Sequence, residues 1–376
     1  MRIGIEAQRL FRKKKHGMDI FALELIKALQ AADTPHDFYI FVKPDEDDKV
    51  ISEKHNFKII KLDGSPYPLW EQWVLPAAVR KHKIDILHCT ANTAPIFSPA
   101  RLITTLHDII YLEKIEINKG TLYQRVGNLY RRWNVPLAAK RSKLICTVSE
   151  YERERIIDRL NVSPEKVVTV YNGVGEHFKK ITDTAKLNAL RKKYKLPVNY
   201  ILFLGNPAPK KNVQRLLQAL AILKKENKLA LPVVIADLNR QYILQLLQDL
   251  GEEELIADIV ACGYVPNDEL PGIYSSAALF LYPSLRESFG IPILEAMSCG
   301  VPVVTSNTSS MPEVAGDAAL LADPLNPQSI AEKINELLTN TTLRETLITK
   351  GHERAKSFSW ENTALQVLKL YGKMNT

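Results

Sequence analysis

Short apolar runs alternate with longer amphipathic stretches along almost the whole chain. The runs have the length and the β-branched or aromatic content of buried strands, and the stretches have the apolar spacing of helices. We predict strands near residues 2–6, 37–42, 58–62, 85–88, 101–106, 143–148, 167–171, 200–204, 232–236, 258–261, 279–283, 302–306 and 319–322. We predict helices near 18–31, 70–82, 121–140 and 149–160, others between the later strands, and a last amphipathic helix over 354–374.

This alternation predicts the fold class. Parallel strands are joined by crossover helices, so such a chain forms parallel sheets covered on both faces. Two series of strands and helices predict two doubly wound α/β domains, with the seam in the glycine-bearing loop Tyr171–Gly175. We place the first domain at residues 1–180 and the second at 181–353. The last helix, within 354–376, has no partner strand.

Length and composition indicate a globular protein. A chain of 376 residues with 46% hydrophobic and 24% charged residues can fill two hydrophobic cores. No segment offers the ~18 consecutive apolar residues of a membrane span, and the chain opens directly with a strand, which predicts no signal peptide. The four cysteines are scattered without a CxxC pair, as is typical of reduced thiols. We therefore expect a cytoplasmic protein.

The net charge of +8 is unevenly distributed. Residues 1–180 hold 30 basic and 22 acidic residues, whereas residues 181–376 hold 20 of each. A basic face can serve nucleic acid, an anionic membrane or an acidic substrate. Because no helix-turn-helix or RNA-binding signature is present, we expect no nucleic-acid partner.

One basic segment of the first half also carries aromatic residues. The stretch Tyr123–Trp133 interleaves tyrosines and a tryptophan with Arg125, Arg131 and Arg132. Such a mixture suits the interface of an anionic membrane. It equally suits a solvated helix that buries its aromatic residues in the core, and the sequence leaves both interpretations open.

Two glutamates are the first candidates for chemistry. Glu287 and Glu295 flank the helix start in SLRESFGIPILEAMSCGVPVV, which reads as strand, loop, helix and strand. Pro292 suits the first turn of that helix, and Gly300 and Pro302 suit its end. The two carboxylates therefore lie beside the carboxyl end of a parallel strand, where open α/β sheets bind ligands.

Two further loops have features of phosphate-binding sites. Lys210 and Lys211 follow the strand 200–204 and precede a helix, so either lysine can hold a phosphate as a point charge. Gly17 opens the helix 18–31, where backbone amides and the helix dipole favour an anion. There is no GxGxxG motif, which argues against a dinucleotide.

These motifs, taken in order, resemble one family over nearly the whole chain: the retaining GT-B glycosyltransferases of family 4, or glycosyl transferases group 1. The longest match is SLRESFGIPILEAMSCGVPVVTSNTSSMPEVAGDAALLADP. Shorter matches are TTLHDIIYL, CTVSEYERERII, PAPKKNV and FSWENTALQVLKLYGKM. The resemblance implies two Rossmann-like domains that face each other across a cleft. It implies that the first domain binds the acceptor and the second the donor, and that the C-terminal helix crosses back to the first domain.

The resemblance also implies the residues that bind the donor. Glu295 would accept hydrogen bonds from the ribose hydroxyls, and Glu287 would contact the transferred sugar. Lys211 would neutralise the leaving diphosphate, whose charge grows in the transition state. Backbone amides would bind the sugar and the phosphates, from Phe289, Gly290 and Ile291 in the second domain and from Gly17 in the first.

His107 would point at the donor sugar from the first domain. The chain departs from the family pattern at Asn206, which stands where an arginine is common in the donor-phosphate loop. We expect Lys210 to supply the missing charge. Glu287, His107 and Lys211 are thus the expected catalytic residues.

No metal and no cofactor is expected, because GT-B enzymes neutralise the diphosphate with basic side chains and helix termini. The acidic run Asp45–Asp48 follows a strand and a proline, which predicts a solvated loop. The resemblance implies retention without a protein nucleophile, with the leaving phosphate accepting the proton of the acceptor hydroxyl.

We therefore expect a retaining, metal-independent hexosyltransferase that uses a GDP- or UDP-sugar in the synthesis of surface polysaccharide or lipopolysaccharide. Its partners would be the nucleotide-sugar donor, a glycan or lipid-linked acceptor and an anionic membrane surface. Two alternatives stay open. One is another GT-B enzyme acting on nucleotide sugars, an epimerase or a phosphorylase, and the other is a catalytically inactive partner subunit.

Overall fold

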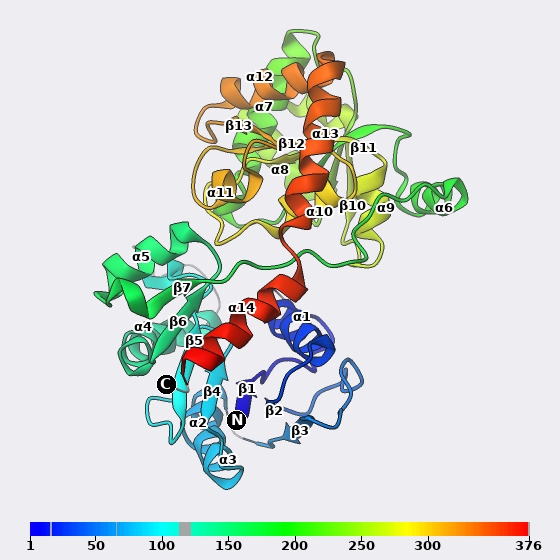
Figure 1. The fold of residues 1–376 in the computed structure, drawn as a ribbon. Helices are drawn as coiled ribbons and strands as arrows, with labels where there is room; N and C mark the ends of the chain where they lie inside the picture. Colours follow the sequence, from blue (N-terminus) through cyan, green and yellow to red (C-terminus); the bar gives the residue numbers. More distant parts are fainter. Residues whose placement is uncertain (16, 65, 113–121, 375–376) are drawn as a thin grey trace. The chain divides into compact units, whose positions relative to one another are not determined.

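A computed structural model describes residues 1–15, 17–64, 66–112 and 122–374. The chain forms two compact units. The N-terminal unit comprises Met1–Gly173 and the segment that begins at Trp360, and the C-terminal unit comprises Val174–Ser359. Each unit contains one parallel sheet with helices on both faces (Figure 1). The predicted pair of doubly wound α/β units is confirmed.

The N-terminal sheet has the strand order β3-β2-β1-β4-β5-β6-β7. Its strands are β1 (Arg2–Glu6), β2 (Asp37–Val42), β3 (Phe57–Lys61), β4 (Ile86–Cys89), β5 (Arg101–Thr105), β6 (Leu144–Thr147) and β7 (Val167–Thr169). Its helices are α1 (Gly17–Ala31), α2 (Tyr67–Leu69), the π-helical η1 (Trp70–Val74), α3 (Leu75–Lys81), η2 (Ile110–Leu112), α4 (Leu122–Arg141), α5 (Glu150–Leu160), η3 (Pro164–Lys166) and α14 (Trp360–Lys373).

The C-terminal sheet has the strand order β10-β9-β8-β11-β12-β13. Its strands are β8 (Tyr200–Leu204), β9 (Val233–Ala236), β10 (Ile259–Gly263), β11 (Ala277–Tyr282), β12 (Val303–Ser306) and β13 (Leu320–Ala322). Its helices are α6 (Thr184–Tyr194), η4 (Pro209–Lys211), α7 (Val213–Lys225), α8 (Arg240–Leu250), η5 (Glu253–Asp258), α9 (Leu270–Ser275), α10 (Ile291–Ser298), α11 (Met311–Ala315), α12 (Pro327–Thr339) and α13 (Thr341–Lys356). Each predicted strand is present, with its ends shifted by two residues at most.

Both faces of the N-terminal sheet are buried, so its strands are apolar at successive positions. Ile3, Ile5 and Ile40 belong to the core beneath α1 and α14, whereas Phe41 belongs to the core beneath α3. Gly4 lies on the face of Phe41, where an added Cβ would stand 2.7 Å from the phenyl ring. Glycine is therefore required there by close packing.

The C-terminal helix is shorter than the sequence predicted. A continuous helix over 354–374 is wrong, because α13 ends at Lys356 and α14 begins at Trp360. Between them the Phe358 carbonyl accepts a hydrogen bond from the Val174 backbone amide (2.9 Å), and the Phe358 ring packs edge-on against Phe289 (5.7 Å). These contacts hold the connection in a non-helical conformation. Residues 354–359 therefore belong to the C-terminal unit.

Helix α14 completes the core of the N-terminal unit. Trp360, Val367 and Leu370 pack with the buried face of α1, beside which α14 lies in Figure 1. The Tyr371 hydroxyl is 2.8 Å from Nδ1 of the buried His88 on β4. The end of the chain is thus part of the N-terminal unit's core.

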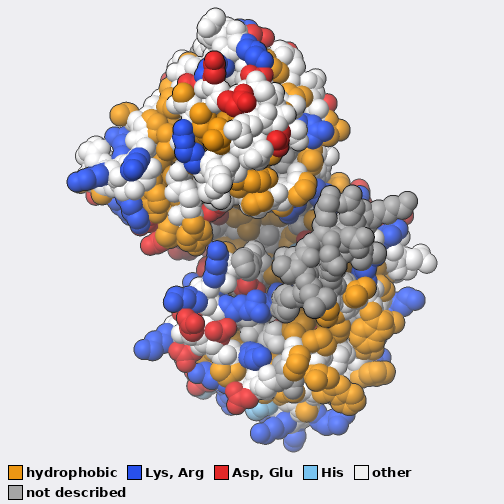
Figure 2. Space-filling model, turned by 180° about the vertical axis from the view of Figure 1, so that it is seen from behind, with side chains coloured by type: hydrophobic (Ala, Val, Ile, Leu, Met, Phe, Trp, Pro, Cys, Tyr) orange, Lys and Arg blue, Asp and Glu red, His pale blue; other side chains and the backbone are white. Residues whose placement is uncertain are grey.

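Large hydrophobic side chains are exposed mainly on the N-terminal unit. Seven of them lie on α2, η1, α4 and the loop after β4: Leu69, Trp73, Phe97, Val126, Leu129, Trp133 and Leu137. Figure 2 shows hydrophobic side chains gathered over one face of this unit. Since isolated exposed apolar residues are normal but clusters mark interaction sites, this face is a candidate binding surface.

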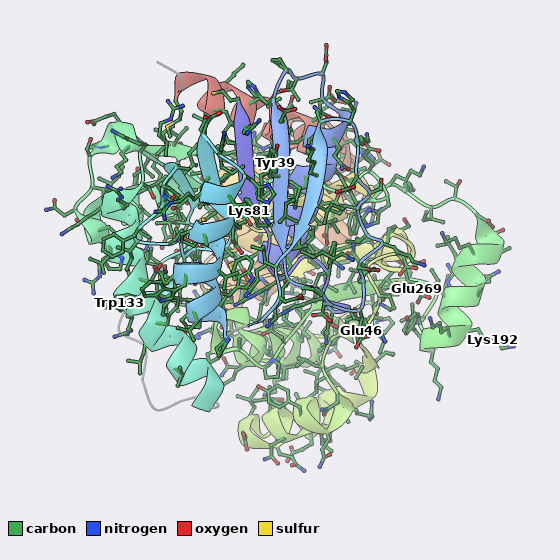
Figure 3. All side chains as sticks on the ribbon, turned by 90° about the horizontal axis from the view of Figure 1, so that it is seen from below. Tyr39, Glu46, Lys81, Trp133, Lys192 and Glu269 are labelled. Atoms are coloured by element: carbon green, nitrogen blue, oxygen red, sulfur yellow. The ribbon has the colours of Figure 1, made fainter. Side chains whose placement is uncertain are left out.

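The acidic run after β2 is held in ion pairs. Glu46, labelled in Figure 3, lies 3.4 Å from Lys13, and Asp48 lies 2.9 Å from Lys61. Asp47 pairs with Lys15. Two residues of the basic cluster Arg12–Lys15 thus pair with the acidic run, and Lys61 on β3 pairs with its last residue.

The core role of α14 can be tested by truncating one leucine. Leu370 is buried, so Leu370→Ala should lower the free energy of unfolding of the N-terminal unit by about 2–5 kcal/mol. Leu365→Ala, on the exposed side of the same helix, should change it by less than about 0.5 kcal/mol. All four tryptophans (Trp70, Trp73, Trp133 and Trp360) lie in this unit, so tryptophan fluorescence during urea unfolding reports on it alone. Equal effects of the two substitutions would contradict the packing described.

Candidate functional site

The C-terminal sheet reverses its strand order between β8 and β11. The chain runs from β8 outward to β9 and β10, then returns to place β11 on the other side of β8. The loops that leave the carboxyl ends of β8 and β11 therefore diverge to opposite faces of the sheet, the usual position of a ligand site. These loops carry Lys210, Lys211 and Glu287, so the structure brings three predicted site residues together.

Lys211 and Glu287 form a largely buried ion pair. The Lys211 ammonium donates to Oε1 of Glu287 (2.7 Å) and to the Tyr282 hydroxyl (3.0 Å), and it lies 4.6 Å from the centre of the Tyr282 ring. Lys210 is more exposed and stands 3.6 Å from Oε2 of the same carboxylate. Lys210 thus adds a second positive charge beside Glu287, and its predicted role toward a phosphate stays a prediction.

The charge of Glu287 is maintained against its burial. Burial by itself would raise the pKa of this carboxyl, but the ammonium groups of Lys211 and Lys210 outweigh it and hold the pKa below its ordinary value. The backbone of Glu287 is fixed by two serines that follow β12. The Ser309 and Ser310 hydroxyls donate to the Glu287 carbonyl at 2.6 and 3.0 Å. The carboxylate is therefore ionised and rigidly placed.

Glu295 lies in the first turns of α10. Its pKa is shifted in the opposite direction to that of Glu287. Its Oε2 accepts a hydrogen bond from the Tyr274 hydroxyl (2.9 Å). Burial of the carboxyl raises the pKa of Glu295 to about 7, although this hydrogen bond and the charge of Lys211 both oppose the rise. Glu295 can thus take up or release a proton near neutral pH.

Gly290 sets the direction of α10. Its φ of 109° lies in a region that side chains disfavour, and it places Ile291 as the first helical residue. Phe289 is buried and its carbonyl accepts from the Ser310 hydroxyl (2.7 Å). Asn206 has a local role, because its Oδ1 accepts from the Ala208 amide (2.9 Å) and closes the turn after β8.

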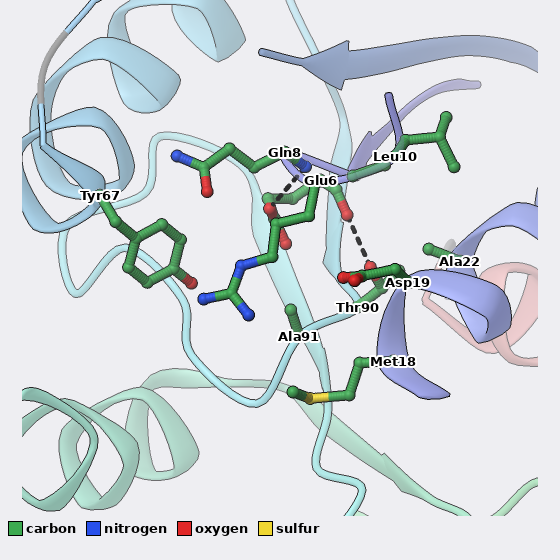
Figure 4. Close-up of a pocket in the computed structure, with 11 residues that line it drawn as sticks. Glu6, Gln8, Leu10, Met18, Asp19, Ala22, Tyr67, Thr90 and Ala91 are labelled. Atoms are coloured by element: carbon green, nitrogen blue, oxygen red, sulfur yellow. Dashed lines mark hydrogen bonds between the residues drawn. The ribbon is translucent and has the colours of Figure 1, made fainter. Parts of the chain in front are cut away.

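The N-terminal sheet reverses its strand order in the same way, between β1 and β4. A small hollow lies at the carboxyl ends of these strands, and its empty space of about 250 Å³ includes open solvent. Glu6, Asp19, Tyr67 and Thr90 line it from four different segments (Figure 4). This second ligand position was not predicted from the sequence.

Glu6 is a buried carboxyl that lines this hollow. It is 1% exposed, its Oε1 accepts from the Gln8 amide (3.0 Å), and its Oε2 has no hydrogen-bond partner among the residues that the structure describes. Burial raises the pKa of Glu6 to about 7, against the effect of the Gln8 hydrogen bond. A buried carboxyl oxygen without a partner can bond to a ligand hydroxyl or to water.

His107 lies after β5, one strand beyond the hollow. Its Nε2 is 2.9 Å from the Thr90 carbonyl, which can only accept, so this nitrogen carries the proton. Burial lowers the pKa of His107, which leaves the ring neutral with Nδ1 as its acceptor. Gly17 begins α1 and is exposed, and an added Cβ there would meet no atom within 4 Å.

The side chains that hydrogen-bond to Glu287 and Glu295 were not predicted from the sequence. Tyr274 and Ser309 lie far from Glu295 and Glu287 in the chain, so no local spacing relates them. Glu6 ends an apolar strand and resembles an ordinary strand-end residue. Its only signal was the position at a carboxyl strand end, next to the phosphate-type loop before Gly17.

Comparisons with known proteins agree over both units. Residues 16–177 match the family described as Glycosyltransferase Family 4, and residues 188–354 match the one described as Glycosyl transferases group 1. The O-antigen chain mannosyltransferase B of Escherichia coli is 35% identical over 307 residues, which cover 81% of this chain and 77% of that protein. The serotype-specific mannosyltransferase WbdA of Escherichia coli is 33% identical over 276 residues, which cover 71% of this chain and 32% of that protein.

A solved structure shows the same fold. Anabaena Alr3699/HepE in complex with UDP has a TM-score of 0.76 and 20% identity, with 99% of this chain and 100% of that chain covered.

The two lysines allow a matched test of the buried pair. Lys211→Met leaves the buried Glu287 carboxylate without its nearest partner, so it should destabilise the C-terminal unit by about 3–5 kcal/mol at neutral pH. Lys210→Met removes a partner whose side chain is 39% exposed and should cost no more than about 1 kcal/mol. Hydrogen exchange of the β8 and β11 amides, followed by mass spectrometry, measures the loss of stability in both variants. A loss as large for Lys210→Met would contradict this assignment.

Glu6 should make the stability of the N-terminal unit depend on pH. Because its pKa when folded, about 7, lies above the ordinary 4.5, its contribution is fully present below about pH 4.5 and is lost as the pH rises to about 7. The expected loss is about 3 kcal/mol. The buried His88 acts in the opposite direction, since burial lowers its pKa to about 3.

The difference between the wild type and Glu6→Gln isolates the glutamate. Relative to the wild type, the variant should gain stability between pH 4.5 and 7, measured by urea unfolding with tryptophan fluorescence. A constant difference over this range would show that Glu6 has an ordinary pKa.

Proposed function

The chain belongs to the group 1 glycosyl transferases, and from this premise we propose that it moves a hexose, mannose or a similar sugar, from a GDP- or UDP-sugar to a glycan or lipid-linked acceptor. It is a glycosyltransferase with the two-domain α/β GT-B fold. The mannosyltransferase names of its relatives support mannose and an acceptor in surface polysaccharide synthesis.

The arrangement of Lys211, Lys210 and Glu287 at the β8–β11 reversal carries the proposal. Two ammonium groups converge on one carboxylate, where a ligand's phosphates can replace the carboxylate as their partner. A diphosphate bound by Lys211 would free Glu287 to contact the transferred sugar and the positive charge that develops at its anomeric carbon. The growing charge of the leaving diphosphate would be stabilised by the same lysines.

The remaining donor contacts follow from local geometry. Glu295 accepts hydrogen bonds from the ribose hydroxyls in this proposal, in place of or beside the one from Tyr274. The backbone amides of Phe289, Gly290 and Ile291 bind sugar and phosphate oxygens at the start of α10. In this proposal the start of α1 at Gly17, where no side chain blocks approach, would bind the distal phosphate, and His107 would contact the donor sugar.

The reaction we propose retains the anomeric configuration. The bond between the anomeric carbon and the phosphate oxygen breaks, and the acceptor oxygen bonds to the carbon from the same face. The acceptor hydroxyl's proton passes to the leaving phosphate oxygen, so no protein nucleophile is used. Lys210 and Lys211 supply the positive charge that a metal ion supplies in other transferases, which supports metal independence.

A lipid-linked acceptor places the reaction at the cytoplasmic face of a membrane in this proposal. Of the helices in the described ranges, none is both long enough and apolar enough to cross a bilayer. The excess positive charge of the N-terminal unit supports peripheral contact with an anionic surface. The hollow at Glu6 and Asp19 offers polar groups to acceptor hydroxyls.

Calorimetric titration with UDP, GDP, CMP and NAD tests the donor site. We expect UDP or GDP to bind in the presence of EDTA, and Glu295→Ala to weaken binding about 10- to 100-fold, because it removes the hydrogen bonds that this carboxyl accepts from the ribose. Glu332→Ala, at an exposed position of α12, is the matched control and should bind as the wild type does.

The absence of binding by any nucleoside diphosphate would overturn the proposal and favour an inactive partner subunit. Binding without release of nucleotide from the sugar donor would favour an epimerase.

A further inference from the structure

Helix α4 exposes an apolar stripe to solvent. Val126, Leu129, Trp133 and Leu137 recur at the spacing of one helical face and are 57, 59, 55 and 38% exposed. The opposite face of α4 is buried against the sheet. The side chains of 122–125, including Tyr123 and Arg125, lie outside the described residues. Because Trp133 is exposed, this helix does not simply bury its aromatic residues in the core.

The stripe continues over two neighbouring segments. Leu69 and Trp73, one helical turn apart on α2 and η1, are 51 and 73% exposed, and Phe97 in the loop after β4 is 83% exposed. Gln72 joins these segments to α4, because its amide donates to the Tyr130 hydroxyl (2.8 Å) and its Oε1 accepts from the Ile96 amide (3.0 Å). We call Leu69, Trp73, Phe97, Val126, Leu129, Trp133 and Leu137 the apolar platform.

A buried carboxylate fixes the platform from beneath. Glu71 is fully buried and accepts from the Tyr67 hydroxyl (2.7 Å), from Gln72 (3.0 Å), and from the hydroxyls of Thr93 and Tyr130. These partners come from α2, η1, the loop after β4 and α4. These hydrogen bonds to Glu71 therefore hold the three exposed segments together from their buried side.

The surroundings of the platform are strongly basic. Residues 72–112 and 122–149, which include six of the seven platform residues, contain ten Lys and Arg residues and two acidic residues, Asp85 and Asp108. The basic cluster Arg12–Lys15, by contrast, is paired with the acidic run after β2. The excess positive charge of the N-terminal unit is thus concentrated in the segments that carry the platform.

A basic hollow adjoins the apolar stripe. Arg132, Pro136 and Lys140 form the next face of α4, and with Arg159 of α5 they line an open hollow of about 740 Å³ that includes solvent. Arg132 and Arg159 are oriented by their bonds to the carbonyls of Tyr111 (2.8 Å) and Leu112 (3.0 Å). Three cationic side chains around one hollow fit a phosphate group.

We propose that the apolar platform and the basic hollow dock this protein onto an anionic lipid bilayer. Trp73, Trp133 and their apolar neighbours insert at the level of the headgroups, and Arg132, Lys140 and Arg159 receive a lipid phosphate. Exposed tryptophans beside arginines and lysines are suited to that interface. A surround with a net positive charge matches a negatively charged membrane better than it matches a second copy of the same surface, which would repel it.

This inference rests on the proposed function in one respect, since a lipid-linked acceptor would lie in the same bilayer. The docking itself requires no donor and no turnover, so it can fail or succeed independently of the donor site.

Flotation of the full chain with vesicles tests the docking. We expect binding to vesicles of phosphatidylethanolamine and phosphatidylglycerol, weaker binding to phosphatidylcholine vesicles, and loss of binding as salt is raised. Trp133→Ser and Trp73→Ser should each lower the partition coefficient about tenfold or more, and Lys140→Gln about fivefold. GDP or UDP affinity, measured on the same samples, should not change.

Matched controls come from the other unit. Val198→Ser and Tyr264→Ser remove side chains that are 73 and 62% exposed, and Lys192→Gln removes an exposed charge on α6. These variants should bind vesicles as the wild type does. Equal losses in the control variants, or no dependence on anionic lipid, would overturn the proposal. A dimer in light scattering that Trp133→Ser dissociates, without vesicle binding by the wild type, would assign the platform to a second copy instead.

Discussion

The Lys211–Glu287 ion pair joins the loops that leave two adjacent parallel strands, and the chemistry of the C-terminal unit depends on it. Removing both charges from water is costly, and the cost is offset only because Lys210, Tyr282 and the serines after β12 complete the arrangement. Stability alone does not explain such a group of buried charges. The group is better explained as a preorganised site in which a phosphate can take the place of a carboxylate.

The N-terminal unit uses the same topological position with different electrostatics. At the reversal between β1 and β4, Glu6 accepts a hydrogen bond from the Gln8 amide, and burial raises its pKa to about 7. The C-terminal reversal therefore offers two lysines suited to phosphates, and the N-terminal one offers a carboxyl that titrates near neutral pH and is suited to hydroxyls. This division matches a donor that carries a diphosphate and an acceptor that is a polyol, as we propose.

The strands and the resemblance could be read from the sequence because both are local signals. Each β-strand is a short apolar run, and Glu287, Glu295 and Lys211 lie in continuous motifs next to strand ends. The groups that tune them could not be read, since Tyr274 reaches Glu295 only through the packing of α9 on α10. The helix break at 357–359 and the exposure of Trp133 likewise depend on tertiary contacts. Periodicity reports that a helix has an apolar face, but not whether anything covers that face.

We propose that this chain transfers a hexose with retention, using lysines in place of a metal. The most direct measurement incubates the protein with GDP-mannose or a UDP-hexose and a lipid-linked glycan extract in EDTA, and determines the anomeric configuration of the product by NMR. The account predicts a glycosidic product with the donor's α configuration, formed at an undiminished rate in EDTA and lost in Glu287→Gln. A β-linked product, or transfer that requires an added divalent metal, would contradict it.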